Sequence, residues 1–182
     1  MKSRILLIIF SVAFLGLQVG CVVHEALRTP QPVSVNLDVD PGYFAMLPLE
    51  LSNHIKVVSY GMCGLACSDV DTIYITKELL ATCDNYEEFL FSVMHEEAHI
   101  VLGHVHASTA MHNTPEGYNE AAFNVMSRSQ EYQADLTAAR YMKGNGYTIK
   151  SCSILKELNT SLIETTHPSS EKRYAECVKV WE

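Results

Sequence analysis

The feature that most constrains this chain is the run His-Glu-Glu-Ala-His at positions 95–99. It lies in a stretch of apolar residues at helical spacing, which begins with Asn85 as an N-cap and Glu88 three residues later and continues to Val105. Residues i and i+4 share one face of a helix, so both imidazoles can reach a single ion. The segment therefore predicts a long helix that carries two metal ligands.

The residue between the two histidines predicts catalysis at a zinc ion. Glu96 is rotated about 100° around the helix from His95, which places it beside the metal, where it can take a proton from zinc-bound water. Zinc lowers the pKa of that water from about 15.7 to near 7, so a carboxylate can complete its activation at neutral pH. Glu97 is expected to be an ordinary acid on the helix surface.

A catalytic zinc ion normally has three protein ligands and one open position, so a third ligand is needed downstream. The run Glu-Tyr-Gln-Ala-Asp at 131–135 places two acids at i and i+4 on one face of a second helix. We expect Glu131 to bind zinc. Asp135 would accept a hydrogen bond from a ligand imidazole, most readily that of His95, and fix its tautomer. In isolation the two acids would instead indicate a solvated helix face.

The whole pattern predicts an α+β fold, with a small antiparallel or mixed sheet of about three strands packed on helices. The length of 182 residues favours one domain, expected at 41–182, after a tether and first strand at 21–40. Strands are expected at 33–39, 55–60 and 71–76, with a loop at 61–70. Helical segments are expected at 85–105, from 114 to the Gly-Asn-Gly stop at 144–146, at about 151–164 and at about 169–180.

The N-terminus predicts export. Residues 1–20 begin with two basic residues, followed by an apolar stretch at 5–17 that is too short for a membrane span of about 20 residues and suits a signal peptide. Cys21 follows the sequence Leu-Gln-Val-Gly, which resembles the bacterial lipobox. A lipidated Cys21, an ordinary cleaved signal and an uncleaved anchor running on to Val23 remain open. Each would place the folded part in the periplasm or outside the cell.

The formal net charge is −8, and it would become −10 without residues 1–20, which hold two basic residues and no acid. This balance disfavours nucleic acid as a partner, because basic surfaces supply most of that attraction.

The six cysteines favour disulfides, which persist in exported proteins. Inert thiols and a zinc cluster are the alternatives, although only one closely spaced pair exists. We expect a Cys152–Cys177 disulfide, because antiparallel packing of the last two helices would bring these residues together. The other bond would then be shared among Cys63, Cys67 and Cys83, with one of them left over if Cys21 is lipidated.

Four ordered segments resemble the gluzincin metallopeptidases, a family that includes HtpX-like proteases, CaaX prenyl endopeptidases and small periplasmic lipoproteins. They are the strand and its continuation at 71–80, the extended zinc motif with its trailing Gly-His at 95–104, the Glu-x-x-x-Asp element at 131–135, and the late His-Pro and Arg at 166–173. The chain has no further hydrophobic spans, so a prenylated substrate is not expected.

The resemblance implies a zinc-dependent endopeptidase with one zinc ion per chain. The implied ligands are His95, His99 and Glu131, with Glu96 as general base and acid. It also implies that His167 and Arg173 lie near the cleft, where they stabilise the oxyanion or order the site. From the residues alone, His167 could equally be a capping or surface histidine, and Arg173 could brace the structure by pairing with an acid.

The remaining histidines do not predict a second metal site. His104 lies five residues beyond His99, and on a continuous helix it would point away from the zinc. The spacing of His106 and His112 is also not one that indicates a second metal site.

The substrate is expected to be a peptide or an unfolded protein, including misfolded proteins of the cell envelope. An edge strand at Ile73–Thr76 could pair with its backbone, which demands little of the side chains. The segment Gly103–Asn119 is long enough for a lid, or could be a simple connection. The alternative function is a non-catalytic binding or chaperone-like module stabilised by zinc.

Overall fold

The structure is a computed structural model that describes residues 42–47, 51, 54–58, 64–115, 117–158 and 166–182. The expected signal peptide, Cys21 and the strand expected at 33–39 lie outside these residues.

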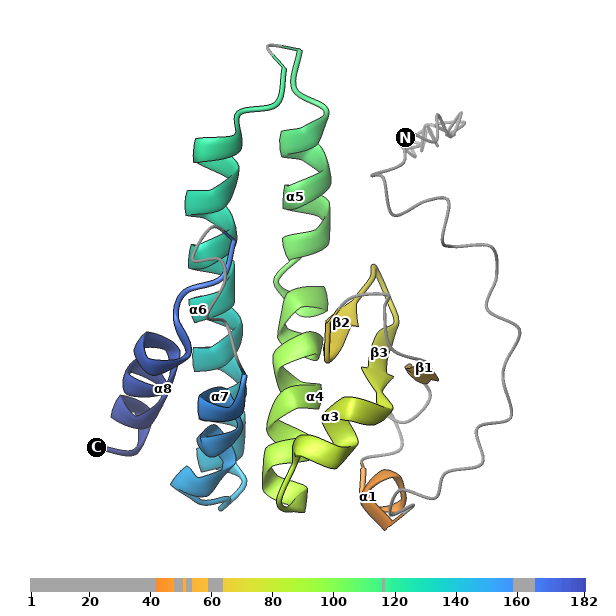
Figure 1. Cartoon of the computed structure of the whole chain (residues 1–182), viewed down its shortest axis with the longest axis vertical. Helices are drawn as coiled ribbons and strands as arrows, with labels where there is room; N and C mark the ends of the chain where they lie inside the picture. The colour runs from red at the N-terminus through yellow and green to blue at the C-terminus, as the bar shows by residue number, and fades with distance from the viewer. Residues whose placement is uncertain (1–41, 48–50, 52–53, 59–63, 116, 159–165) are drawn as a thin grey trace, which may run out of the picture. The chain divides into compact units, whose positions relative to one another are not determined.

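Two long helices, α4 (Tyr86–Val101) and α6 (Glu120–Gly144), pack against each other and form the centre of the described structure. A small sheet lies against α4, while the short C-terminal elements pack on α6 and on the first part of α4 (Figure 1). The expected α+β class is confirmed. The largest buried side chains come from the sheet, from α3, α4 and α6 and from the C-terminal elements, which share one core.

The sheet contains β1 (Ile55–Val58), β2 (Ala66–Ser68) and β3 (Ile73–Thr76) in the order β1-β3-β2. β3 pairs in parallel with β1 and antiparallel with β2. The expectation that Ile73–Thr76 is an edge strand is therefore wrong. Its isoleucines are fully buried, and its backbone is paired on both sides, so no peptide can add to it there.

β2 lies inside the segment 61–70 that the sequence predicts as a loop. It is only three residues long and polar at its end, so it carries no alternation of apolar and polar residues that could indicate a strand. Its place comes from pairing with β3, in which Ser68 lies opposite Ile73. β2 is thus the edge strand on the side of the sheet that contacts α4.

The start of α4 follows from its sequence. The Asn85 side chain accepts a hydrogen bond from the backbone N–H of Glu88, as expected of an N-cap. The Glu88 carboxylate reaches back one residue further than in a capping box and accepts from the N–H of Asp84 at 2.7 Å. Before α4, Thr76 caps the short helix α3 (Lys77–Thr82), which is not among the helices expected from the sequence.

α4 ends at Val101, four residues earlier than expected, because Gly103 adopts a left-handed conformation with φ of +69°. A second helix, α5 (His104–His112), then begins. The segment expected as a lid or connection is thus mostly helical, and α5 runs beside α6 (Figure 1).

α6 begins at Glu120, after Asn119 caps it by accepting from the N–H of Ala122, and not at Thr114 and Pro115. The expected Gly-Asn-Gly stop is present, with Asn145 as the C-cap and Gly146 at φ of +81°.

The C-terminal part consists of the short helices η2 (Ile149–Ser153), α7 (Ile154–Glu157), α8 (Ser170–Val178) and η3 (Lys179–Trp181). The expected disulfide between Cys152 and Cys177 is present, and it joins η2 to α8 in the core. Cys67 is also disulfide-bonded, and Cys83 is a buried free thiol. Across the described residues, no helix combines the length and apolar character that a membrane span requires.

Candidate metal centre

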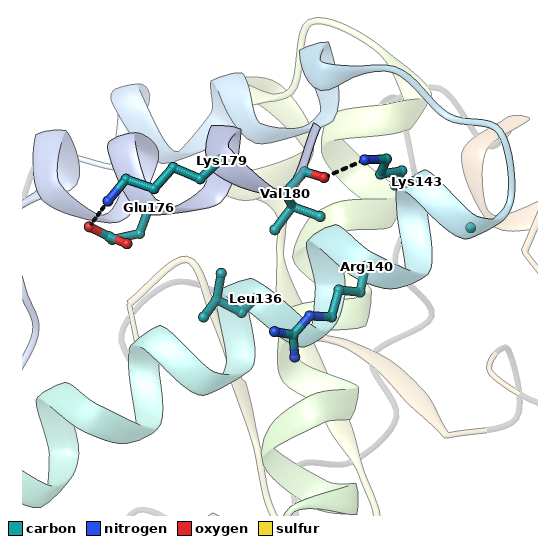
Figure 2. A pocket seen from close by; sticks show the side chains of 7 residues that line it. Leu136, Arg140, Lys143, Glu176, Lys179 and Val180 are labelled. Atoms are coloured by element: carbon teal, nitrogen blue, oxygen red, sulfur yellow. Dashed lines mark hydrogen bonds and ion pairs between the residues drawn. The ribbon is translucent and has the colours of Figure 1, made fainter. Parts of the chain in front are cut away.

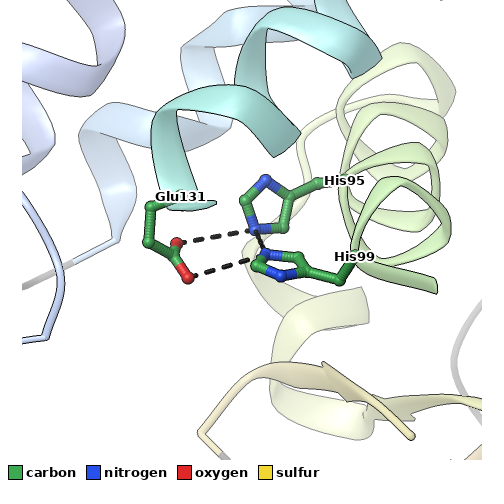
Figure 3. A group of neighbouring side chains, drawn as sticks. All are labelled: His95, His99 and Glu131. Atoms are coloured by element: carbon green, nitrogen blue, oxygen red, sulfur yellow. Dashed lines mark hydrogen bonds and ion pairs between the residues drawn. The ribbon is translucent and has the colours of Figure 1, made fainter. Parts of the chain in front are cut away.

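The two histidines of α4 face Glu131 of α6 (Figure 3). The Nε2 atoms of His95 and His99 lie 3.1 Å apart, and each lies 3.6 Å from an oxygen of the Glu131 carboxylate. All three side chains are largely buried. The structure therefore brings together the three residues that the sequence predicts as ligands, and they form a possible metal-binding triad.

The spacing of these atoms fits a tetrahedral zinc ion. Zinc–nitrogen and zinc–oxygen bonds of about 2.0–2.1 Å place two ligand atoms of a tetrahedron about 3.3 Å apart. The separations of 3.1 and 3.6 Å lie on either side of that value. The 3.6 Å separations between the histidine nitrogens and the Glu131 oxygens are too long for good hydrogen bonds.

The charges also fit a divalent cation. Three carboxylates, those of Glu96, Glu131 and Asp135, are buried here, and the buried guanidinium of Arg173 faces them. When the carboxylates are ionised and the imidazoles neutral, two negative charges remain for a cation to balance. A buried charge is tolerated only when it is paired, so this arrangement favours a dication.

Asp135 holds His95 in position. Its Oδ1 accepts from the Nδ1 of His95 at 2.9 Å, which is the contact expected from the sequence. A proton on Nδ1 leaves Nε2, the atom that faces Glu131, as the nitrogen with a free lone pair in neutral His95. The residue that fixes the tautomer is thus supplied by the same helix as the third ligand.

Arg173 of α8 holds both acids of α6. It donates to Asp135 through Nε at 2.7 Å and Nη2 at 2.8 Å, and its Nη1 lies 3.1 Å from the Glu131 carboxylate. Burial alone would raise the pKa of both carboxyl groups, but the partners His95 and Arg173 lower both. The structure therefore places Arg173 as a brace for the acids, which is one of the two roles that the sequence leaves open.

The same charged groups shift the pKa values of the two histidines in opposite directions. Burial would lower the pKa of His95, but Asp135 and Glu131 outweigh it and raise this pKa to about 10. Burial and the neighbouring His95 lower the pKa of His99 to about 3. At neutral pH and without metal, His95 therefore holds an extra proton while His99 is neutral.

Glu96 lies on the side of α4 that faces β2, and the nearby hydroxyl of Ser68 favours the ionised form of its carboxylate and so acts to lower the pKa of Glu96. Burial raises the pKa of Glu96 above its ordinary value. A carboxyl group whose pKa lies above its ordinary value accepts a proton more readily and can return it, as a general base and acid requires.

His167 lies at the rim of the site. Its side chain is 51% exposed, and its Nε2 lies 3.6 Å from a Glu131 oxygen. The structure thus brings His167 near the triad but gives it no hydrogen bond to the triad. Its exposed position is compatible with a contact to a substrate.

His104 is buried near the centre, in a position that its spacing in the sequence does not predict. The expectation that it points away from the zinc site assumes a continuous helix, whereas the turn at Gly103 brings its ring onto that of His99, with Nδ1 atoms 3.0 Å apart. His104 contacts the nitrogen of His99 that faces away from Glu131, so it is no ligand of this triad. The Gly103–His104 pair at the end of the extended motif is the sequence feature that could have indicated the contact between His104 and His99.

A separate hollow lies between α6 and the C-terminal helices, lined by Leu136, Arg140, Lys143, Glu176, Lys179 and Val180 (Figure 2). Lys143 donates to the carbonyl of Val180, and Lys179 pairs with Glu176. None of its residues belongs to the triad, so this hollow is not part of the candidate metal centre.

Comparison with known families supports this interpretation of the site. Residues 116–180 match the model of Peptidase family M48, whose members are zinc metallopeptidases. The matched segment contains Glu131, Asp135, His167 and Arg173 and begins after the two histidines of α4. No curated protein and no solved structure matches the chain. The resemblance to the gluzincin peptidases is therefore confirmed through residues 116–180, which are similar to peptidase family M48.

Proposed function

We propose that the protein is a zinc-dependent endopeptidase that hydrolyses peptide bonds in unfolded or misfolded proteins. The observation that carries this proposal is the convergence of His95, His99 and Glu131, whose ligand atoms lie within 4.8 Å of one another, beside the buried carboxylate of Glu96.

When bound by the triad, zinc would supply a Lewis acid that polarises the scissile carbonyl and lowers the pKa of water. Glu96 takes the proton of the attacking water while the water oxygen bonds to the carbonyl carbon. It then delivers this proton to the leaving nitrogen as the C–N bond breaks. Ser68 orients the Glu96 carboxylate, and the raised pKa of Glu96 suits both the uptake and the delivery of the proton.

The other charged residues keep this geometry. Asp135 holds the ring of His95 through Nδ1, and Arg173 holds Asp135 and Glu131 together. His167, on the exposed side of the triad, is proposed to donate to the oxyanion that develops on the substrate carbonyl.

We propose that an extended peptide pairs with the backbone of β2, and not with that of β3 as the sequence predicts. β2 is an edge strand of the described sheet, and its Ser68 reaches Glu96. Pairing through the backbone reads main-chain groups, so it favours a broad range of unfolded substrates.

The proposed location is the cell envelope, with anchoring through a lipid on Cys21. The support is the signal-like sequence at 1–20 and the lipobox-like run before Cys21. The Cys152–Cys177 disulfide agrees with an oxidising compartment.

The test of the proposed activity uses purified protein, an unfolded protein substrate such as casein, and a chelator. Glu96→Gln should retain zinc and lose proteolysis by about 10²- to 10⁴-fold, because glutamine cannot accept the proton. Glu97→Gln, the next residue on the same helix, is the matched control and should be nearly silent. If zinc-loaded wild-type protein cleaves no unfolded substrate, the non-catalytic zinc-stabilised module becomes the better explanation.

A further inference from the structure

His104 is buried between α4 and α6, although it is the first residue of α5. On a continuous helix a residue at i+5 lies about 140° around the axis from residue i, and His104 could not contact His99. The left-handed turn at Gly103 changes the direction of the chain, and the ring centroids of His99 and His104 lie 4.9 Å apart. The contact thus depends on this turn.

The hydrogen bonds of His104 form a chain with one consistent direction. Its Nε2 lies 3.2 Å from the side-chain oxygen of Gln133, which can only accept, so this Nε2 carries the proton. In a neutral ring the Nδ1 of His104 is then an acceptor. It faces the Nδ1 of His99 at 3.0 Å, so His99 must donate from Nδ1.

The consequence for His99 is a fixed tautomer. With its proton on Nδ1, the free lone pair of His99 is on Nε2, the atom that faces His95 and Glu131. The opposite tautomer would direct an N–H group at the place where a cation would be bound. His99 therefore has a partner of its own, just as His95 has Asp135.

A further set of contacts holds His104 in place. Gln130 donates to the backbone carbonyl of His104 and accepts from Ser108 of α5. Both glutamines belong to α6, which also carries Glu131. The same helix thus supplies the third ligand and the two glutamines that contact His104.

We propose that His104, oriented by Gln133, is a positioning residue that holds the ring and the tautomer of His99 for metal binding through Nε2. This inference deepens the proposed function and rests on His99 being a ligand.

The first experiment needs no substitution. Long-range ¹H–¹⁵N correlation spectra of protein labelled at histidine nitrogen distinguish the two neutral tautomers, because ring nitrogens with and without a proton have very different chemical shifts. We expect the proton on Nε2 of His104 and on Nδ1 of His99, in the metal-free and in the zinc-loaded protein. A proton on Nδ1 of His104 would overturn the proposal.

The second experiment measures zinc affinity by competition with a chelator. His104→Phe keeps a ring and removes the acceptor, so affinity should fall by about 10- to 100-fold, as for other residues that orient a metal ligand. His104→Asn places a carbonyl oxygen three bonds from Cα, at the same position along the side chain as Nδ1. It should recover most of the lost affinity, which a purely space-filling role would not predict.

The matched control is His106→Phe, since His106 is an exposed histidine on the same helix and should leave zinc affinity unchanged. If His104→Phe does not fold, Gln133→Leu replaces it, because Gln133 is exposed and lines the hollow between α5 and α6. Gln133→Leu should lower affinity several-fold and mix the tautomers of His104.

These results separate the inference from the proposed function. Zinc affinity equal to wild type in both His104→Phe and Gln133→Leu would refute the positioning role and leave the peptidase proposal standing. A wild-type protein that binds no zinc would refute the peptidase proposal. The tautomers in its spectra would still support or contradict the hydrogen-bond chain.

Discussion

At the scale of single residues, the candidate centre is held together by compensating charges. Asp135 is fully buried and has two partners, Arg173 and His95, which together satisfy both of its oxygens. Glu131 faces the same arginine from one side and both histidines from the other. Each acid therefore has more than one partner, and removal of a charged partner leaves a buried carboxylate less well compensated, which is destabilising in a protein interior.

Arg173→Met is expected to destabilise the metal-free protein by about 3–5 kcal/mol, because it removes the guanidinium that pairs with two buried carboxylates and leaves His95 as their remaining charged partner. Chemical denaturation measures the free energy of unfolding. Lys179→Met is the matched control, because its ion pair with Glu176 is largely exposed and should contribute only about 0–1 kcal/mol. Equal effects of the two substitutions would show that the Arg173 ion pairs add no special stability.

Zinc affinity is expected to rise with pH. The pKa of His95 is about 10 in the metal-free protein, so below that pH a zinc ion must displace one proton from the ring, and the displacement becomes easier as the pH increases. The affinity should change by up to about tenfold per pH unit, with release of about one proton per zinc. Chelator competition between pH 6 and 8, with proton release followed in weak buffer, measures both quantities. An affinity that does not vary with pH would contradict the raised pKa of His95.

At the scale of elements, the turn between α4 and α5 decides which side chains reach the centre. Gly103 is held at φ of +69°, and a Cβ added there would meet nothing within 4 Å. The glycine is therefore required by the backbone conformation and not by lack of space. This turn places His104 on His99 and directs α5 along α6.

Gly103→Ala is expected to reduce stability by about 1 kcal/mol, since alanine in the left-handed region is strained. It should also weaken zinc binding, because relief of that strain moves His104 away from His99. Gly144→Ala is the control, as Gly144 is helical and equally unhindered, and it should be neutral or slightly stabilising. Thermal denaturation measures the stability of both variants, and chelator competition measures their zinc affinity. If Gly103→Ala and Gly144→Ala have the same stability and zinc affinity, the left-handed turn at Gly103 does not position His104.

At the scale of the whole molecule, the disulfide connects the C-terminal helices to the centre. Cys177 lies one helical turn after Arg173 on α8, and its bond to Cys152 ties α8 to η2, which packs against α4. The elements that supply the ligands and the arginine that braces them thus belong to one connected unit.

The double substitution Cys152→Ala and Cys177→Ala is expected to destabilise the protein by about 3 kcal/mol, because the bond closes a loop of 25 residues. It should also lower zinc affinity by freeing Arg173. Urea denaturation and chelator competition measure these effects, and the double variant is preferable to a reductant because Cys67 is disulfide-bonded as well. Cys83→Ala is the control. A double variant with wild-type stability would contradict the expected role of the bond.

The sequence alone determined the features that depend on local periodicity. His95 and His99 share a helix face because they are four residues apart, and Asn85 begins that helix because its side chain can accept from the N–H of Glu88. Glu131 and Asp135 share a face of α6 for the same reason, because they are also four residues apart. Each of these relations lies within about one helical turn, where the geometry of the backbone is known without the rest of the molecule.

The tertiary structure decided which neighbours meet across the fold. Ile73–Thr76 carries the same side chains whether it is a central or an edge strand, and only its pairing with β1 and β2 shows that it is central. Arg173 reaches Asp135 because α8 packs on α6. His104 reaches His99 because one glycine adopts a left-handed conformation. Such contacts depend on the relative placement of elements far apart in the chain, or on a single backbone dihedral, and neither leaves a periodic signal in the sequence.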